Sequence, residues 1–320
     1  MWKTVLRRVL VMIPQLFILS ILIFILAKKM PGDPFTGLIT PQTSPAVLEE
    51  LRRKAGFYDP WHVQYIRWMG NAFKGNFGMS YTYKLPVSTL IGQRVNNTFI
   101  LSLFSMTLTY MLAIPLGILS GRYQNSLLDR GVTLYNYVSY TIPTFVLSLI
   151  MVWFFGYTLG WFPTTGSVTI GLTPGTFKYF IDRIHHIMLP AITYALLATT
   201  GTIQYLRNEI IDAKSLDYVK TARSKGVPEN VVYSRHIFRN SILPIAAFFG
   251  YSITGLLSGS IFIERIFSYP GMGKFFIDSM LNKDFSVVIT LILLYGLLYL
   301  IGSLISDITM TIIDPRIRIE

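Results

Sequence analysis

Six stretches without Asp, Glu, Lys or Arg constrain the fold of this chain more than any other feature of its sequence. They cover residues 9–27, 95–121, 131–177, 184–206, 240–263 and 285–306. A helix needs about 20 apolar residues to cross the hydrocarbon layer of a bilayer, and a charge near its centre costs roughly 2.5 kcal/mol or more. We therefore predict one transmembrane helix in each stretch. In the longest, the span is placed at 132–158, because Gly, Pro and Thr are frequent in the residues that follow.

The predicted fold class is an all-α polytopic membrane protein with six transmembrane helices, and the composition agrees with it. Of the 320 residues, 52% are apolar or aromatic and only 14% are charged, against about 25% charged residues in soluble domains. The net charge of +12 is spread over small clusters. A nucleic-acid binder would instead show a dense basic patch, so nucleic acid is not an expected partner. Cysteine is absent, which excludes disulfides and thiolate metal sites.

Basic residues predict the orientation of the chain, because short cytoplasmic loops carry more Lys and Arg than short outer loops. With the N-terminus inside, 14 Lys and Arg fall on the inner side and 5 on the short outer loops. The inner segments are 1–8, 122–130, 207–239 and 307–320, and the short outer loops are 159–183 and 264–284. We therefore expect both termini in the cytosol. The first stretch exceeds a signal-peptide core and no small-residue cleavage site follows it, so we expect a retained span.

The spans divide the chain into three parts. Residues 1–27 form a tail with the first span, residues 28–94 an extracytoplasmic subdomain, and residues 95–320 a core of five spans. Within the subdomain, helix signals run from Pro45, at a first helical position, to Gly56, just past the end. A second amphipathic helix is predicted at 59–73, rich in aromatic residues that also suit an interfacial belt.

The segment 207–240 carries the clearest local signals in the chain. Ser215 stands where an N-cap is expected and Asp217 falls in the first helical turn, followed by basic residues in the last turn and by Gly226 at the terminating position. Pro228 then opens a second helix. We predict a short helix, a sharp turn and another helix that project into the cytosol between spans four and five. Such a projection suits docking of another protein, although an ordinary solvated connector has the same signals.

Motifs for catalysis are absent from the sequence. It has no G-x-x-x-x-G-K-[ST] motif for ATP and no H-E-x-x-H motif for zinc. The sequence at 255–259 faintly resembles an intramembrane serine protease motif, but no histidine lies in a later span to act as the base. We expect no catalytic residue, no metal and no cofactor bound to this chain.

The uncharged spans predict a particular kind of translocation pathway. Ion-coupled carriers usually bury ionisable groups in the bilayer, so the sequence disfavours a secondary transporter. A lumen must then be lined by hydroxyl and amide groups, although each of these groups can equally serve helix packing. The candidate lining residues on the second and fifth spans are Ser102, Ser105, Thr109, Ser252, Thr254 and Ser258. A polar but uncharged path suits substrates recognised through their backbone.

Four motifs, in order along the chain, carry a resemblance to a known family. They are Arg7-Arg8 with the first span and PGDP at 31–34; GFYDP at 56–60 with Gln64-Tyr65 and Trp68; DYVKTARSKG at 217–226 with Leu243-Pro244; and FSYPGMG at 267–273 with Asp314-Pro315-Arg316. With them the chain resembles the first permease subunit of bacterial ABC importers for oligopeptides and dipeptides, a family that includes nickel permeases. The resemblance implies a type I ABC importer permease fold.

The resemblance also implies that 207–240 is a coupling segment, which inserts into a groove on an ATPase subunit. The residues implied in coupling are Asp217, Tyr218, Thr221, Ala222, Arg223, Lys225 and Gly226. ABC importers in general carry E-A-A-x-x-x-G here. In this chain Lys220 replaces the glutamate, as in peptide-type permeases. Small Thr221 and Ala222 are expected to let the helix lie close against the ATPase, with Tyr218 as an anchor.

The partners implied by the resemblance are a second, homologous permease, two ABC ATPases that carry ATP and Mg²⁺, and an extracytoplasmic binding protein that delivers the peptide. The chain is then a multi-pass protein of the bacterial cell membrane. Nickel or another small solute remains an alternative cargo, which the lack of His, Cys or acidic clusters in the spans disfavours. An ATP-independent channel or carrier, or a membrane scaffold, would not depend on a separate ATPase.

Overall fold

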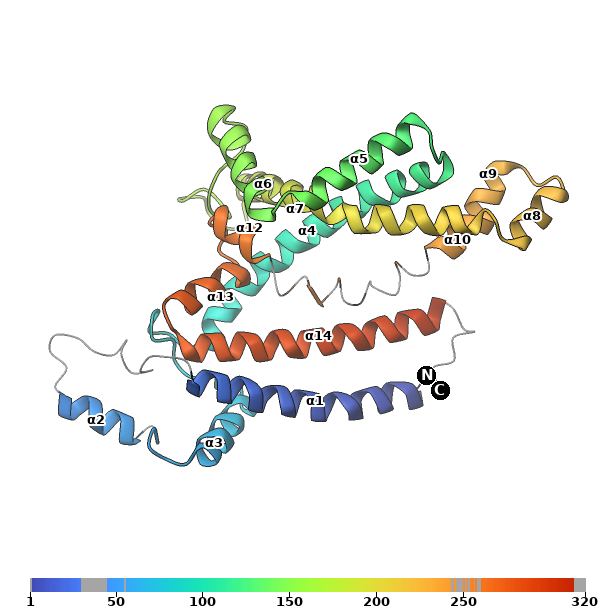
Figure 1. Ribbon diagram of the computed structural model, residues 1–320. Helices are drawn as coiled ribbons and strands as arrows, with labels where there is room; N and C mark the ends of the chain where they lie inside the picture. Colours follow the sequence, from blue (N-terminus) through green and yellow to red (C-terminus); the bar gives the residue numbers. More distant parts are fainter. Residues whose placement is uncertain are drawn as a thin grey trace.

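The computed structural model describes residues 2–29, 45–54, 56–242, 245, 250, 252, 254–255, 257 and 260–313. Within these residues the fold is all-α, as predicted, and its one β-bridge joins Met79 to Pro86. The helices are α1 (Trp2–Lys29), α2 (Pro45–Lys54), α3 (Trp61–Phe73), α4 (Val87–Arg122), α5 (Leu127–Thr141), α6 (Thr144–Met151), η2 (Val152–Thr158), α7 (Phe177–Ala213), α8 (Asp217–Ser224), α9 (Glu229–Val231), η3 (Val232–Ile237), α10 (Phe238–Ser241), α12 (Ile261–Ile266), α13 (Met272–Leu281) and α14 (Phe285–Ile313), of which η2 and η3 are π-helical (Figure 1).

Four helices in the described part of the chain are long and apolar enough to cross a membrane, namely α1, α4, α7 and α14. They contain the first, second, fourth and sixth of the charge-free stretches, so the sequence located these spans correctly. α7 extends past its stretch at both ends and reaches Ala213, within the coupling segment. The fifth predicted span, at 240–263, lies partly outside the described residues, so its course is not described.

The third predicted span is not one straight helix. α5 and the helix formed by α6 and η2 meet at an angle of 101°, so the segment predicted as one span at 132–158 is broken into two helices. Pro143 supplies the cause, because a proline lacks an amide hydrogen and disfavours helical backbone at the preceding residue. Ile142 is accordingly extended, with φ −79° and ψ 119°. The described residues thus contain four helices long and apolar enough to be spans, or five spans if this bent pair crosses as a unit.

α4 and α7 run parallel and side by side, and they share the most extensive contact between described helices. Two glycines of α4, spaced four residues apart, allow this approach. A Cβ atom on Gly117 would lie 3.0 Å from Cβ of Leu206, and one on Gly121 would lie 2.8 Å from Cβ of Ile210. Small residues at this spacing let the backbones of membrane helices pack closely.

We expect Gly121→Val to separate α4 from α7, because the new side chain would overlap Ile210 and the carbonyl of Arg207. Overpacking of this kind costs about 1–3 kcal/mol, and it will appear as a lower unfolding temperature of the detergent-solubilised chain. Gly131→Val is the matched control, since a Cβ atom at this helical glycine of α5 meets nothing within 4 Å. Equal destabilisation by both variants would contradict the packing role.

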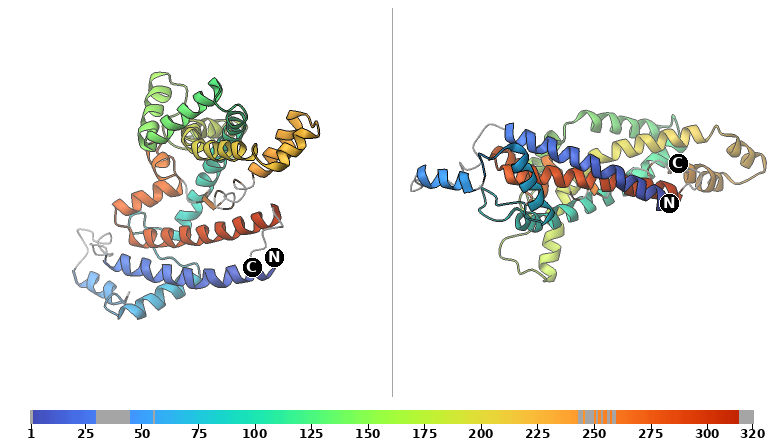
Figure 2. Two further views of the ribbon diagram at one scale, coloured as in Figure 1. Left: turned by 45° about the vertical axis from the view of Figure 1, so that its right-hand side comes forward. Right: turned by 90° about the horizontal axis from the view of Figure 1, so that it is seen from below.

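α1 and α14 form a second pair, antiparallel and side by side in both figures (Figures 1 and 2). Arg8 and Asp307 form an ion pair of 2.9 Å near one end of it. The start of α1 and the end of α14 lie at the same end of the molecule as α8 and α9, and α2 and α3 lie at the opposite end. The coupling segment and the 28–94 subdomain are therefore at opposite ends of the long helices.

Within the 28–94 subdomain, α3 packs on α1. α2 begins at Pro45 as predicted, and Gly56 after it has a φ of +69°. α3 begins at Trp61, two residues later than predicted, with Pro60 as its N-cap. The ring of Tyr65 packs edge-on against Phe24 of α1. This contact joins α3 to the end of α1 that is opposite the coupling segment.

Candidate functional site

The coupling segment folds into two helices joined by a tight turn, as the sequence predicted, but its first helix begins one residue late. The N-cap of α8 is Leu216, so the prediction that Ser215 caps this helix is wrong. The Ser215 hydroxyl donates instead to the carbonyl of Asp212, at 2.8 Å. The turns that follow α7 keep the backbone helical until Leu216, whose ψ of 148° is the first extended value.

The turn after α8 is a Schellman motif built on Gly226. Its φ is +72°, a left-handed conformation that favours glycine. The amide of Gly226 donates to the carbonyl of Arg223 at 2.9 Å, and the amide of Val227 donates to that of Ala222 at 3.2 Å, which is the paired pattern of this motif. Pro228 then caps the second helix, which runs as α9, η3 and α10 to Ser241.

A buried apolar cluster holds α8 against the end of α7 and against η3. Its members are Leu206, Ile210, Ala213, Val219, Ala222, Val232 and Ile237. Ala222 is only 6% exposed, so its small side chain lets α8 lie close to this chain's own helices. Of the two small residues expected to lie toward an ATPase, only Thr221 is on the surface. Its hydroxyl donates to the carbonyl of Asp217 at 2.8 Å.

The exposed side of α8 carries the remaining candidate residues. All six candidates other than Ala222 are exposed, namely Asp217, Tyr218, Thr221, Arg223, Lys225 and Gly226. Arg223 forms an ion pair of 2.7 Å with Glu229 across the turn, and its hydrogen bond to this carboxylate raises the pKa of the guanidinium. Surface pairs contribute at most about 1 kcal/mol, so these charges remain available to a partner.

Polar contacts also fasten the coupling segment to the end of α4. Lys214 donates to the backbone carbonyl of Arg122 at 2.9 Å, and burial lowers the pKa of the lysine. The Arg122 guanidinium donates to the side chain of Asn230 at 2.7 Å and lies 4.7 Å from the ring centre of Tyr233. These contacts join the second helix of the coupling segment to the end of α4.

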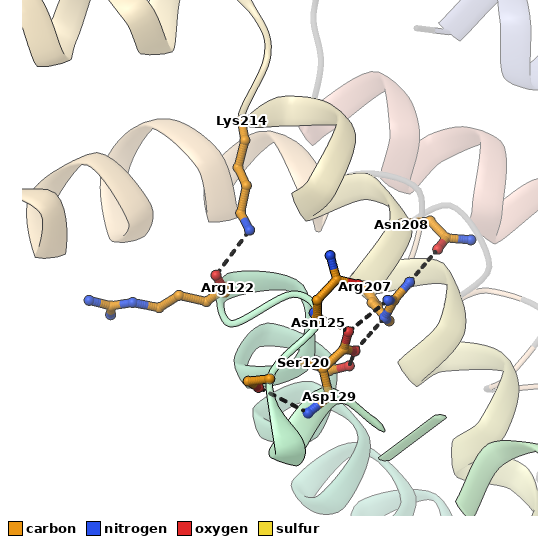
Figure 3. A network of polar contacts seen from close by, with 8 residues as sticks. Ser120, Arg122, Asn125, Asp129, Arg207, Asn208 and Lys214 are labelled. Carbon is orange, nitrogen blue, oxygen red and sulfur yellow. Dashed lines mark hydrogen bonds and ion pairs between the residues drawn. The ribbon is translucent and has the colours of Figure 1, made fainter. Parts of the chain in front are cut away.

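A buried carboxylate joins α4, α5 and α7 next to this contact (Figure 3). Asp129 is 2% exposed and accepts two hydrogen bonds from the Arg207 guanidinium, at 2.6 and 2.8 Å. The Ser120 hydroxyl and the backbone amide of Asn125, the latter at 2.8 Å, complete its shell. Four hydrogen-bond donors therefore satisfy the Asp129 carboxylate. We name Ser120, Asn125, Asp129 and Arg207 the carboxylate junction.

The sequence did not single out the carboxylate junction. Asp129 and Arg207 stand at the edges of two charge-free stretches, where they looked like ordinary flanking charges. One local signal was present, since Ser126 caps α5 by accepting a hydrogen bond from the Asp129 amide at 3.2 Å, the S-x-x-D pattern of a helix start. Only the parallel packing of α4 and α7 brings Arg207 to this helix start.

A polar cavity of about 380 Å³ lies among α4, α7 and the described residues of 252–263. Of the six predicted lining residues, four line it, namely Ser102, Ser105, Thr109 and Ser252. Thr254 is buried elsewhere, where its hydroxyl donates to the carbonyl of Gly250 and its side chain lies beside Gly302 of α14. That position fits the alternative of helix packing. Ser258 lies outside the described residues.

Two tyrosines that the sequence analysis missed also line this polar cavity. They are Tyr110 of α4 and Tyr194 of α7, and the hydroxyl of Tyr110 lies 3.2 Å from that of Ser252. Ser105 and Thr109 donate to carbonyls of their own helix at 2.8 Å, which leaves their oxygens free to accept. No charged side chain is among the described residues that line the cavity. The cavity can thus recognise hydrogen-bonding groups without fixing an ion.

The motif at 267–273 surrounds a second buried carboxylate at the other end of the long helices. Glu264 accepts hydrogen bonds from the amides of Gly273 and Lys274, at 2.7 and 3.0 Å, and from the Thr98 hydroxyl at 2.9 Å. A Cβ atom on Gly271 would lie 2.4 Å from the Glu264 carboxylate. Glycine is required there because the start of α13 closes directly over this carboxylate.

Comparisons with known proteins extend over the whole chain. The family described as "Binding-protein-dependent transport system inner membrane component" matches residues 113–319, and its N-terminal region matches residues 1–109. The chain is 40% identical over 315 residues to the oligopeptide transport system permease protein AppB of Bacillus subtilis, with 98% of each chain covered. It is 34% identical to a putative peptide transport system permease protein of Brucella abortus and 33% identical to the dipeptide transport system permease protein DppB of Lactococcus lactis, each over 320 residues and the full length of both chains.

Proposed function

Because the chain belongs to the binding-protein-dependent transport system inner membrane components, we propose that it is the permease subunit that forms half of the pathway of an ATP-driven peptide importer. The observation that carries this function is the full-length similarity to permeases named for oligopeptide and dipeptide transport. The chain is accordingly a multi-pass component of the bacterial cell membrane and a transport subunit with no catalytic role of its own.

The polar cavity supports peptide as the cargo. A peptide backbone offers amide donors and carbonyl acceptors, and the cavity offers the hydroxyls of Ser102, Tyr110 and Tyr194 without a fixed charge. Nickel would need imidazole, thiolate or carboxylate ligands, and the described lining residues carry none of these. The names of the relatives of this chain also favour peptide over nickel or another small solute as the cargo.

The geometry of the coupling segment supports its role in energy coupling. An ABC ATPase pair that closes on ATP would move the exposed face of α8, which carries Tyr218, Thr221 and Lys225. The apolar cluster and the Arg122 contacts make α8, the second helix and α4 move as one body. The remaining parts of the importer are then a homologous permease, two ATPase subunits with ATP and Mg²⁺, and an outer binding protein. The coupling segment and both termini face the cytosol.

Reconstitution with the co-purified subunits tests the function. We expect ATP-dependent uptake of a labelled oligopeptide into vesicles in the presence of the binding protein, and no uptake of nickel under the same conditions. A chain that purifies without ATPases and still moves solute without ATP would establish a channel or carrier and overturn the proposal.

Ser102→Trp tests whether the polar cavity is part of the pathway. The indole would fill the cavity and obstruct the passage of a peptide, so we expect uptake at least about tenfold slower, a rise of about 1.4 kcal/mol or more in the transport barrier. The amount of assembled complex should stay unchanged. Leu103→Trp is the control, because this neighbour on α4 is 41% exposed and does not line the cavity. If both variants transport equally well, the cavity is not on the path.

A further inference from the structure

A second cavity, of about 560 Å³, lies between α1, α3 and the start of α14, at the end of the molecule opposite the coupling segment. The pathway proposed above does not use it. Its lining combines aromatic rings with amides and cations, among them Trp61, Trp68, Gln64, Asn71, Lys28 and Arg67. We call it the α1–α3 cavity.

Lys28 is the unusual group in the α1–α3 cavity. The side chain is half-buried, and its Nζ lies 5.8 Å from the ring centre of Phe24 and 5.2 Å from that of Phe57. It donates to the side-chain oxygen of Gln64. Among the described residues, no carboxylate pairs with this ammonium. A partly desolvated cation without a counter-ion attracts an anion more strongly than a hydrated one does.

The surroundings hold Lys28 in place. The Gln64 amide nitrogen donates to the carbonyls of Phe57 and Asp59, at 2.9 and 2.6 Å, so its oxygen is fixed toward Lys28. Arg67, which also lines the cavity, is anchored by a 2.7 Å ion pair with Asp59. The two cations and the side-chain amide of Asn71 therefore line one prearranged space.

The position of the α1–α3 cavity indicates what kind of anion reaches it. α1 is a membrane-spanning helix, and its apolar residues Leu22 and Leu26, which lie six and two residues before Lys28, are 53% and 65% exposed. Trp61 and Trp68 have the amphipathic rings that favour the level of the lipid headgroups. An anion that reaches the cavity along α1 is amphipathic, and the aromatic lining of the cavity can pack against its apolar part.

We propose that the α1–α3 cavity binds an anionic phospholipid, with the headgroup phosphate on Lys28 and Arg67 and the glycerol region against the aromatic rings. The site is on the outer side of the chain, and it depends on no residue of the polar cavity or the coupling segment. Lipid bound there would tie α3 to α1 and α14.

Native mass spectrometry of the assembled complex, purified with dioleoyl-phosphatidylglycerol and dioleoyl-phosphatidylcholine in equal amounts, tests the proposal. Wild-type complex should retain phosphatidylglycerol preferentially. Lys28→Gln should lower its retention by about tenfold, the effect of one lost charge-assisted hydrogen bond. Lys29→Gln removes the same charge from the next, exposed residue, which does not line the cavity, and it should retain the lipid as wild type does.

A second variant keeps the test decisive if Lys28→Gln does not fold. Asn71→Asp leaves Lys28 in place and adds a carboxylate to the cavity, which should also lower phosphatidylglycerol retention. Equal retention of the two lipids by wild type, or equal losses in the Lys28 and Lys29 variants, would overturn the proposal. If inorganic phosphate stabilised the complex against unfolding as effectively as the lipid does, the cavity would be a free-anion site, and this result would overturn the proposal as well.

Discussion

Gly226→Val is expected to abolish ATP-driven uptake while the chain still inserts into the membrane. The φ of +72° at this residue costs an ordinary side chain roughly 1–2 kcal/mol, and a β-branched side chain is the least suited to it. Apart from its two chain neighbours, no atom of the described residues lies within 4 Å of the missing Cβ, so the penalty comes from the backbone conformation. The turn would open and α8 would lose its fixed angle to the second helix.

The measurement is co-purification of the ATPase subunits together with peptide uptake by the same membranes. Gly226→Asn is the matched control, because asparagine is one of the few residues that visit the left-handed conformation. It should keep a large part of both signals. Normal uptake by the valine variant would remove the coupling segment from the mechanism, and equal loss in both variants would show that the conformation of the turn is not the cause.

Arg207→Leu is expected to destabilise the whole helix core, since it leaves the Asp129 carboxylate buried without its charged partner. Breaking a buried ion pair from one side costs about 3–5 kcal/mol. The loss will appear as a lower unfolding temperature in detergent and as less protein in the membrane. It should exceed the effect of Gly121→Val, which adds bulk at the same helix pair without exposing a charge.

The double variant Arg207→Leu with Asp129→Asn separates the unpaired charge from lost packing. Removing the carboxylate removes the need for a counter-ion, so the double variant should be more stable than Arg207→Leu alone. Arg223→Leu is the control for a lost arginine, because its ion pair with Glu229 is on the surface and contributes little. If the second substitution recovers no stability, the carboxylate junction does not act through charge.

The sequence predicted those elements whose cause lies within a few residues or one apolar stretch. The length of the uncharged stretches predicted α1, α4, α7 and α14, because a single apolar segment that crosses a bilayer must satisfy its own backbone hydrogen bonds and therefore forms a helix. Gly226 predicted the turn of the coupling segment, because a helix that ends in the left-handed conformation favours glycine there, and this preference does not depend on where the neighbouring helices lie. The prediction that Ser215 caps α8 was wrong because the helical turns that follow α7 continue for one residue more than expected. The angle at Pro143 was missed although the proline is visible in the sequence.

Only the tertiary structure decided which residues meet. The carboxylate junction joins Asp129 to Arg207 because glycines at 117 and 121 let α4 and α7 lie in contact, and no local pattern encodes the direction of that approach. Ala222 was read as a surface residue, yet it packs inside the chain, since the side of α8 that is buried depends on where α7 ends. Charge spacing thus determined where the chain crosses the membrane, and close packing between helices distant in sequence decided which polar groups form sites.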